Sequence, residues 1–224
     1  MMKRRLIVFV SIVVLFAFLA VALYLGAVVT DNSETGVQDL VGVEIREYEG
    51  ERLSSIADFR ENSIRGSQMV DLETYSLKIT GLVENPAEYS FPEVVDEFQN
   101  FRKVVTLHCV EGWSVKILWQ GIMVQDLIER ARSLPEAEVV IFRAYDGYST
   151  SLPLDYVTGE GILMAHKMNG VLLPPERGAP FQLVAESKLG YKWIKWITEI
   201  ELSDDTGYLG FWESRGYPNN ADVG

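Results

Sequence analysis

The sequence predicts a mixed α+β fold that contains more strand than helix. Short segments rich in β-branched and aromatic residues recur along the chain, separated by Gly, Pro, Asn-Gly and Asp-Gly turn signals. Helical signals occupy two short stretches, 91–98 and 121–131. The 194 residues that follow position 30 in the 224-residue chain suit one compact domain.

The first 30 residues predict a membrane-spanning helix. Positions 6–29 carry no charge, and as a helix at about 1.5 Å per residue they would reach roughly 36 Å, enough to cross a bilayer. Lys3, Arg4 and Arg5 precede this span. The positive-inside rule therefore leaves the N-terminus in the cytoplasm and the rest of the chain on the extracytoplasmic side.

A cleaved signal peptide is the alternative for this segment. Ala20-Val21-Ala22 has the small-x-small form of a cleavage site, although the core of such a peptide is usually only about 7–15 residues long. We assign residues 1–30 to a membrane anchor or signal segment. Residues 31–57 are polar and poorly patterned and are assigned to a tether, which leaves residues 58–224 as the functional domain.

The elements of the domain are predicted in chain order. Helix 91–98 has Pro92 in its first turn, and helix 121–131 repeats apolar residues at i, i+3, i+4 and i+7 from Val124. Met168-Asn169-Gly170-Val171 predicts a tight hairpin turn. Strands are predicted over 72–79, 104–110, 138–147, 148–154, 181–186 and 191–202.

The charge and cysteine content exclude two classes of protein. The chain holds 20 basic and 32 acidic residues, and the three basic residues of the first 30 leave 17 basic against 32 acidic, or −15, for the rest. Such a surface repels phosphate backbones, so nucleic acid is not expected as a partner. Cys109 is the only cysteine, which rules out an internal disulfide.

Three roles compete for the Cys109 thiol. A free cysteine often packs as a small buried apolar group. A nucleophile would need a histidine, but His108 is its strand neighbour and should face the opposite side, while His166 lies in a predicted helical or turn context without a motif. A metal ligand is the third role. Zinc would need more ligands than one cysteine and two histidines provide, whereas a cofactor that brings its own sulfurs would supply the other ligands itself.

The sequence around Cys109 favours the third role. Gly112 leaves room for a flat group, and Trp113 and Trp119 offer large rigid faces. Further along, "ESKLGYKWIKW" (186–196) places three lysines among aromatic residues in an otherwise acidic domain, a candidate anion or phosphate pocket. The alternative for that stretch is cross-strand pairing around an aromatic core.

Six segments in order resemble the sulfite oxidase-like molybdopterin-dependent oxidoreductases. The resemblance is closest to the single-domain members, which include the periplasmic methionine sulfoxide reductase catalytic subunit, and it covers roughly residues 58–220. The segments are "YSLKITGLVENP" (75–86), "VTLHCVEGWS" (105–114), "WQGIMVQDLIERA" (119–131), "FRAYDGYSTSLPL" (142–154), "MNGVLLPPERGAPFQLVAESKLGYKWIKWITEIEL" (168–202) and "GFWESRGY" (210–217).

This resemblance implies a mainly β fold with flanking helices that encloses a molybdenum–molybdopterin cofactor. It makes Cys109 the catalytic residue and the one protein ligand to the metal, while the dithiolene of the pterin supplies two further sulfurs. Lys195 is implied at the phosphate end of the cofactor. The cofactor-contacting residues implied by the resemblance are Asn62, His108, Cys109, Arg177, Lys192, Trp193 and Lys195.

Two departures from the family pattern bear on function. Gln182 stands where relatives commonly have arginine, which favours an alternative function: a non-enzymatic, membrane-anchored binding domain that keeps the fold without the cofactor. Glu111 lies in the segment where sulfite oxidases carry substrate-binding arginines. Sulfite is therefore a less suitable substrate than an S-oxide or N-oxide.

The expected enzyme is a membrane-tethered, extracytoplasmic oxidoreductase that transfers an oxygen atom to or from a small molecule. The chain carries no haem-binding or nicotinamide motif. The electrons are therefore expected to pass through a separate partner, either a membrane haem protein or an exported cytochrome.

Overall fold

A computed structural model describes residues 36–224 of the chain. The predicted anchor, residues 1–30, and the first part of the predicted tether lie outside the described residues. Within residues 36–224, none of the helices combines the length and the apolar character that a membrane crossing requires.

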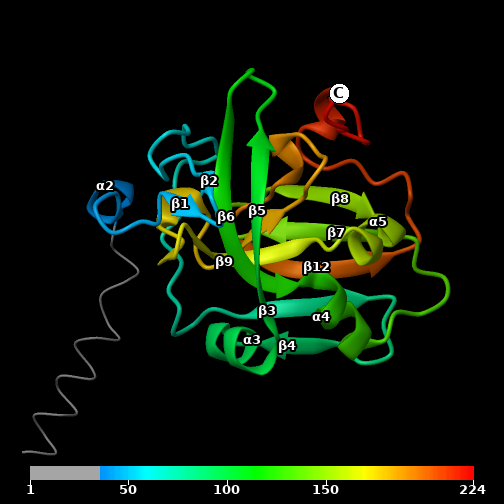
Figure 1. Cartoon of the computed structure of the whole chain (residues 1–224). Coiled ribbons are helices and arrows are strands. Elements are labelled where there is room, and N and C mark those ends of the chain that lie inside the picture. The colour runs from blue at the N-terminus through cyan, green and yellow to red at the C-terminus, as the bar shows by residue number, and fades with distance from the viewer. Residues whose placement is uncertain (1–35) are drawn as a thin grey trace, which may run out of the picture.

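Two five-stranded sheets form the body of the molecule (Figure 1). The first has the order β4-β3-β12-β7-β8, in which β3 and β12 are parallel and the other pairs are antiparallel. Its strands are β3 (Leu77–Gly81), β4 (Ala87–Tyr89), β7 (Val139–Ala144), β8 (Ser149–Pro153) and β12 (Ile197–Ser203).

The second sheet has the order β10-β9-β6-β5, with β11 also paired to β9. Figure 1 shows its long β5–β6 hairpin running across the strands of the first sheet. Its strands are β5 (Asn100–His108), β6 (Ser114–Met123), β9 (Leu163–Met168), β10 (Val171–Leu172) and β11 (Gln182–Val184). A separate two-stranded ribbon pairs β1 (Glu47–Tyr48) with β2 (Glu51–Arg52).

Helices are short and flank the sheets, so the predicted α+β class with more strand than helix is confirmed. Helix α3 (Phe91–Glu97) begins with a capping box between Ser90 and Glu93 and has Pro92 in its first turn. Helix α4 (Val124–Ala131) buries its predicted apolar stripe. The other helices are α2 (Val37–Leu40), α5 (Leu154–Gly159), and the 3-10 turns η1 (Pro175–Arg177), η2 (Gly190–Lys192) and η3 (Glu213–Arg215).

The apolar core fills the space between the layers. Trp119, Phe142 and Phe181 are fully buried there together with aliphatic side chains of both sheets. Strands β6 and β9 approach closely at a bulge, where a Cβ atom on Gly121 would lie 2.1 Å from the Met164 carbonyl oxygen. Only glycine fits at position 121, where β6 passes this close to the β9 backbone. This contact holds the end of β6 that lies away from the hairpin tip against β9.

Two predicted strands begin later than the alternation of their residues suggests. In the first, Asp71 accepts hydrogen bonds from the backbone of Glu73 (2.9 Å) and the hydroxyl of Thr74 (3.2 Å). These bonds hold a turn, and the strand starts at Leu77 instead of residue 72. In the second, Trp196 has a left-handed φ of 55°, so the regular strand starts at Ile197 instead of residue 191.

Two further sequence interpretations are corrected. Strand β6 is not among the predicted elements, although Val115, Ile117 and Trp119 alternate toward the core. His166, which we expected in a helical or turn context, lies in strand β9. The hairpin predicted at Met168–Val171 is confirmed, and Asn169 adopts a positive φ of 45° in its turn.

Residues 36–57 pack against the domain, although they were assigned to the tether. Leu53 and Ile56 are buried in the core region. The buried Glu44 carboxylate accepts hydrogen bonds from the Ser55 hydroxyl (2.5 Å), the Ile56 amide (2.9 Å) and the Asn169 side chain (2.8 Å). Because these bonds satisfy the buried charge, the folded unit begins before residue 58.

His166 is buried beside a small apolar cavity of about 30 Å³. Its Nε2 lies 2.6 Å from Oδ1 of Asn100, whose amide nitrogen already donates to the carbonyls of Val95 and Phe98. Nε2 therefore carries the hydrogen, and Nδ1 has no partner among the described residues. Burial, with a smaller contribution from Lys167, lowers the pKa of His166 from 6.5 to about 4.

This lowered pKa predicts a loss of stability in mild acid. His166 binds a proton more readily in the unfolded state than in the folded state. The free energy of unfolding is therefore unaffected by His166 above pH 6.5 and decreases as the pH falls from 6.5 toward 4. The full effect is up to about 3 kcal/mol. Urea unfolding followed by tryptophan fluorescence should show a shallower pH dependence over this range in His166→Gln than in the wild type. Equal slopes in His166→Gln and the wild type would contradict the prediction.

Candidate cofactor site

Cys109 lies at the tip of the β5–β6 hairpin. Its amide donates to the Trp113 carbonyl (2.9 Å), and its own carbonyl accepts from the Gly112 amide (3.0 Å). Gly112 has a φ of 87°, which a side chain would strain, so glycine is needed here for the turn itself. The long ladder of the hairpin thus holds the single thiol at a fixed position at the end of a sheet.

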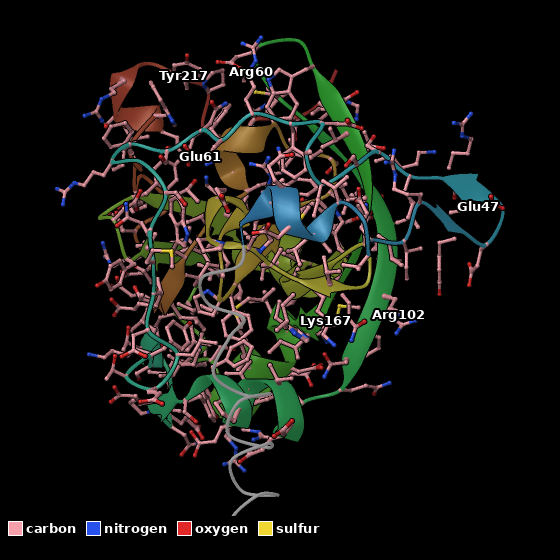
Figure 2. The ribbon with its side chains drawn as sticks, turned by 90° about the vertical axis from the view of Figure 1, so that its left-hand side faces the viewer. Glu47, Arg60, Glu61, Arg102, Lys167 and Tyr217 are labelled. Atoms are coloured by element: carbon pink, nitrogen blue, oxygen red, sulfur yellow. The ribbon has the colours of Figure 1, made fainter. Side chains whose placement is uncertain are left out.

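A cavity of about 450 Å³ opens beside this tip. Figure 2 places Arg60, Glu61 and Tyr217 at the end of the molecule where the hairpin ends. The walls come from five parts of the chain: residues 59–66, the hairpin tip at 107–113, the β7–β8 turn at 146–148, residues 176–196, and residues 212–217.

Asn62 is brought to the predicted metal ligand, since its side-chain amide lies 3.8 Å from the Cys109 sulfur. Glu111 stands two residues further along the tip, where its exposed carboxylate accepts a hydrogen bond from the Trp113 indole (2.9 Å). Burial raises the pKa of the Cys109 thiol, and the Glu111 charge acts in the same direction. The free thiol therefore keeps its proton at neutral pH, and a metal ion that binds it must displace that proton.

Lys195 lines the cavity, as expected for a residue near an anionic group. Its ammonium donates to the Glu61 carboxylate (2.8 Å) and the Glu176 carbonyl (3.2 Å), and it lies 4.2 Å from the centre of the Trp196 ring. Burial lowers the pKa of Lys195, while Glu61 raises it. The ion pair ties the wall at residues 59–66 to the segment that follows η2.

Arg177 lines the cavity and also holds the same wall. Its guanidinium donates to the carbonyls of Ile56 (3.0 Å) and Phe59 (2.6 Å) and lies 4.1 Å from the centre of the Phe59 ring. Arg177 and Lys195 together fix the segment that carries Asn62 to Cys109. Trp193 is buried in the cavity wall, and its indole donates to the Lys188 carbonyl (2.9 Å).

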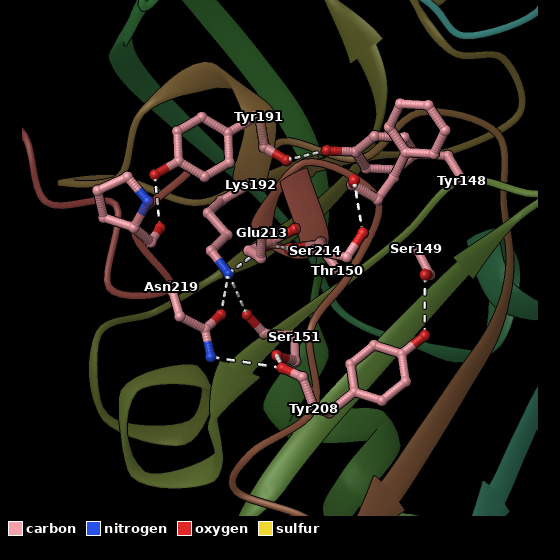
Figure 3. A network of polar contacts seen from close by, with 12 residues as sticks. Tyr148, Ser149, Thr150, Ser151, Tyr191, Lys192, Tyr208, Glu213, Ser214 and Asn219 are labelled. Atoms are coloured by element: carbon pink, nitrogen blue, oxygen red, sulfur yellow. Dashed lines mark hydrogen bonds and ion pairs between the residues drawn. The ribbon is translucent and has the colours of Figure 1, made fainter. Parts of the chain in front are cut away.

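Two of the predicted contact residues are not brought to the cavity. His108 precedes Cys109 in the strand and, as alternation requires, is absent from the lining, while Leu107 and Cys109 are present. Lys192, the last residue of η2, is fully buried in the polar network of Figure 3 and is absent from the cavity lining. Its ammonium donates to Glu213 (2.5 Å), the Ser151 carbonyl (2.9 Å) and Asn219 (2.9 Å). These bonds use all three of its hydrogens, so Lys192 has a structural role.

Three residues of the cavity lining carry a buried side-chain oxygen that has no protein partner among the described residues. Ser63 Oγ, Glu176 Oε2 and Gln182 Oε1 are buried in its lining and have no hydrogen-bond partner among residues 36–224. Buried oxygens left without partners are costly. A pterin offers amino and ring N–H donors that suit such acceptors, so the residues present fit the cofactor. Gln182, which departs from the family pattern, is one of these acceptors.

Several lining residues were not predicted from the sequence. Arg60 and Glu61 adjoin Asn62 in the "RENSIRG" segment, and their motif could have identified them. Aromatic residues of distant segments carry no such signal, because only the fold brings them together. These unpredicted lining residues are Arg60, Glu61, Asp146, Tyr148, Tyr191, Trp212 and Tyr217.

Comparisons with known proteins identify the family of the chain. The profile of the oxidoreductase molybdopterin binding domain matches residues 65–212. An uncharacterized oxidoreductase, YuiH of Bacillus subtilis, is 37% identical over 153 residues, which are 68% of this chain and 76% of that protein. A nitrate reductase [NADPH] of Fusarium oxysporum is 29% identical over 161 residues, 60% of this chain but only 18% of the relative.

A solved structure supports the fold independently. The sulfane dehydrogenase SoxCD of Paracoccus pantotrophus superposes with a TM-score of 0.60 at 22% identity, over 62% of this chain and 41% of that chain. At this identity the match concerns the fold alone. The family profile and the B. subtilis relative lead to one conclusion. The chain belongs to the oxidoreductase molybdopterin binding domain family, and it is an enzyme whose cofactor is molybdenum–molybdopterin.

Proposed function

We propose that this oxidoreductase is tethered to a membrane, faces the extracytoplasmic side, and reduces an organic S-oxide or N-oxide. The observation that carries the choice of substrate is the carboxylate of Glu111, two residues from the metal ligand and exposed at the cavity. An oxoanion such as sulfite would be repelled there. An uncharged S-oxide or N-oxide meets no such penalty.

The proposed reaction consumes two electrons and two protons. The S–O or N–O bond of the substrate breaks, the sulfide or amine is released, and the oxygen leaves as water. When bound, the molybdenum cofactor supplies the oxygen-atom transfer and accepts the electrons from a partner. Binding and orientation fall to the walls around Cys109, where Asn62 contacts the thiol and Arg177 and Lys195 hold the wall that carries Asn62.

The electron donor and the location are part of the same proposal. The sequence offers no haem-binding or nicotinamide motif, which supports a separate donor such as a membrane haem protein or an exported cytochrome. The uncharged segment 6–29, preceded by three basic residues, supports the membrane anchor and its orientation. The nitrate reductase relative is named for NADPH, but this chain spans only 18% of its length.

A substrate panel tests the proposal directly. The full chain is produced in a host that makes molybdopterin and is assayed with sulfoxides and N-oxides plus a reduced dye, and with sulfite plus an oxidised dye. We expect turnover of the S-oxides or N-oxides and little oxidation of sulfite. Sulfite oxidation that exceeds the reduction of every S-oxide and N-oxide would overturn the proposed direction.

Lys195→Ala tests how the chain holds the cofactor. We expect molybdenum and pterin content to fall because the variant removes a half-buried cation and releases Glu61 from the cavity wall. Loss of a supporting contact typically weakens metal-site affinity about 10- to 100-fold. The matched control is Lys116→Ala, which breaks an exposed Lys–Glu pair with Glu51 away from the cavity. Equal cofactor content in the two variants, with both folded, would contradict the assignment of Lys195.

A further inference from the structure

Three aromatic side chains form one continuous part of the cavity wall near Cys109. The rings of Tyr191 and Tyr217 lie 5.4 Å apart, and those of Tyr217 and Trp212 lie 5.2 Å apart. We call Tyr191, Trp212 and Tyr217 the aromatic rim. Gly190 joins the rim to the metal ligand, because a Cβ atom on it would lie 3.7 Å from the Cys109 Cα. Trp212 and Tyr217 each keep 36% of their surface exposed, so the rim offers rings to a ligand.

The rim is held in place by the polar network of Figure 3. The buried pair of Lys192 and Glu213 joins η2, which carries Tyr191, to η3, which follows Trp212 directly. The Tyr191 hydroxyl also donates to the Pro218 carbonyl (2.7 Å), next to Tyr217. Two segments from different parts of the sequence are thereby locked together. The rings need little rearrangement to bind a ligand, and this preorganisation favours affinity.

The charges of the cavity lining determine which substituents can bind at this rim. The lining holds three basic residues and four acidic ones. Lys195 and Glu61 neutralise each other, and the Arg177 guanidinium is bound by two backbone carbonyls, so Arg60 is the remaining lining cation against the carboxylates of Glu111, Asp146 and Glu176. Aromatic ring faces attract cations and accept apolar groups, but they offer nothing to an anion. The acidic balance of the whole chain, with a net charge of −12, acts in the same direction.

We propose that the aromatic rim is the subsite that recognises the non-reacting part of the substrate. It takes an aromatic or apolar substituent that is uncharged or cationic, and it rejects anionic substituents. The proposal rests on the proposed function, in that the reacting group is an S-oxide. Specificity then comes from two separate places: the cavity wall around Cys109 would orient the S–O bond, and the rim selects what is attached to it.

Four sulfoxides that share one reacting group test this subsite. They are dimethyl sulfoxide, methyl phenyl sulfoxide, and methyl phenyl sulfoxides with a para trimethylammonium or a para carboxylate group. With the loaded full-length enzyme and a reduced dye, we expect KM to be lowest for the cationic and neutral aryl compounds. KM should be highest for the carboxylate.

Two rim variants and one matched control test whether the preference for aryl sulfoxides arises at the rim. Trp212→Leu and Tyr217→Leu should each reduce the preference in KM for methyl phenyl over dimethyl sulfoxide about five-fold, which is the size of one aromatic contact. Tyr145→Leu makes the same change at an exposed tyrosine outside the lining and should keep the wild-type preference. Glu111→Gln should narrow the KM difference between the cationic and anionic compounds.

A binding measurement separates this inference from the proposed function. Methyl phenyl sulfone is titrated into the loaded enzyme without electrons, and its Kd is read from tryptophan fluorescence. The expected result is binding that weakens about five-fold in Tyr217→Leu. Failure of every sulfoxide to turn over, with the sulfone still bound, overturns the proposed function alone. Turnover with an aryl preference that neither rim variant changes, or with the carboxylate preferred, overturns the subsite.

Discussion

Replacing Cys109 by serine is expected to remove molybdenum from the purified protein and to abolish its oxidoreductase activity. The thiol is the only cysteine sulfur of the chain, and it stands at the edge of the cavity within 3.8 Å of the Asn62 amide. Loss of a supporting residue around a metal site commonly costs about 10- to 100-fold in affinity or activity. Loss of a direct ligand should therefore exceed about 100-fold.

The same substitution should leave the fold intact. Cys109 is only partly buried and lies in a turn held by backbone bonds to Trp113 and Gly112. A change at such a site usually alters the free energy of unfolding by less than about 0.5 kcal/mol. Metal analysis, pterin content and thermal unfolding are compared with Ser114→Ala, an exposed position just beyond the tip. A Cys109→Ser protein that retains one molybdenum per chain would refute the assignment of the ligand.

The sequence predicts the part of the cavity around Cys109 better than the opposite wall. Cys109, Asn62 and Lys195 lie in short segments whose residue types match a family pattern, and all three line the cavity. The rim is different, since Tyr191, Trp212 and Tyr217 come together only because a buried ion pair joins two distant segments. Periodicity and local motifs carry no information about such a contact.

The two lysines of "YKWIK" show why local patterns mislead here. A regular strand would have put Lys192 and Lys195 on opposite faces, yet the family resemblance implied both as cofactor contacts. The segment is instead a 3-10 turn followed by Trp196 with a left-handed φ. This irregular backbone turns Lys195 into the cavity and Lys192 into the interior, where Glu213 completes its pairing. The identity of that partner, 21 residues away, is a property of the fold.

At Gln182 the structure gives a physical explanation for a departure from the family pattern. The missing arginine suggested a domain that had lost its cofactor. In the structure the Gln182 oxygen is a buried acceptor without a protein partner, in a lining that holds two further orphan oxygens. Apolar residues would fill such a position if nothing polar bound there. The family membership and these orphan acceptors both favour the enzyme over the binding domain.

The second large effect is expected from Lys192→Met. This change leaves the Glu213 carboxylate buried without its cation. It also removes the hydrogen bonds that Lys192 donates to the Ser151 carbonyl and the Asn219 side chain. Both side chains of the pair are completely buried, and breaking such a pair by removing one partner costs about 3–5 kcal/mol. For a domain of this size that corresponds to a fall in Tm of about 10 °C.

Three comparisons distinguish the buried pair from its surroundings. Lys116→Met breaks an exposed pair with Glu51 and should lower stability by less than about 1 kcal/mol. The double variant Lys192→Met/Glu213→Leu removes both charges and should recover much of the lost Tm, because the desolvation cost disappears with them. If the double variant is no more stable than Lys192→Met, the loss of stability does not come from an unpaired charge.

Since the pair also joins the two segments of the rim, the recovered double variant should still show a weaker preference for aryl sulfoxides than the wild type. Stability and substrate preference would then be separable consequences of one buried contact.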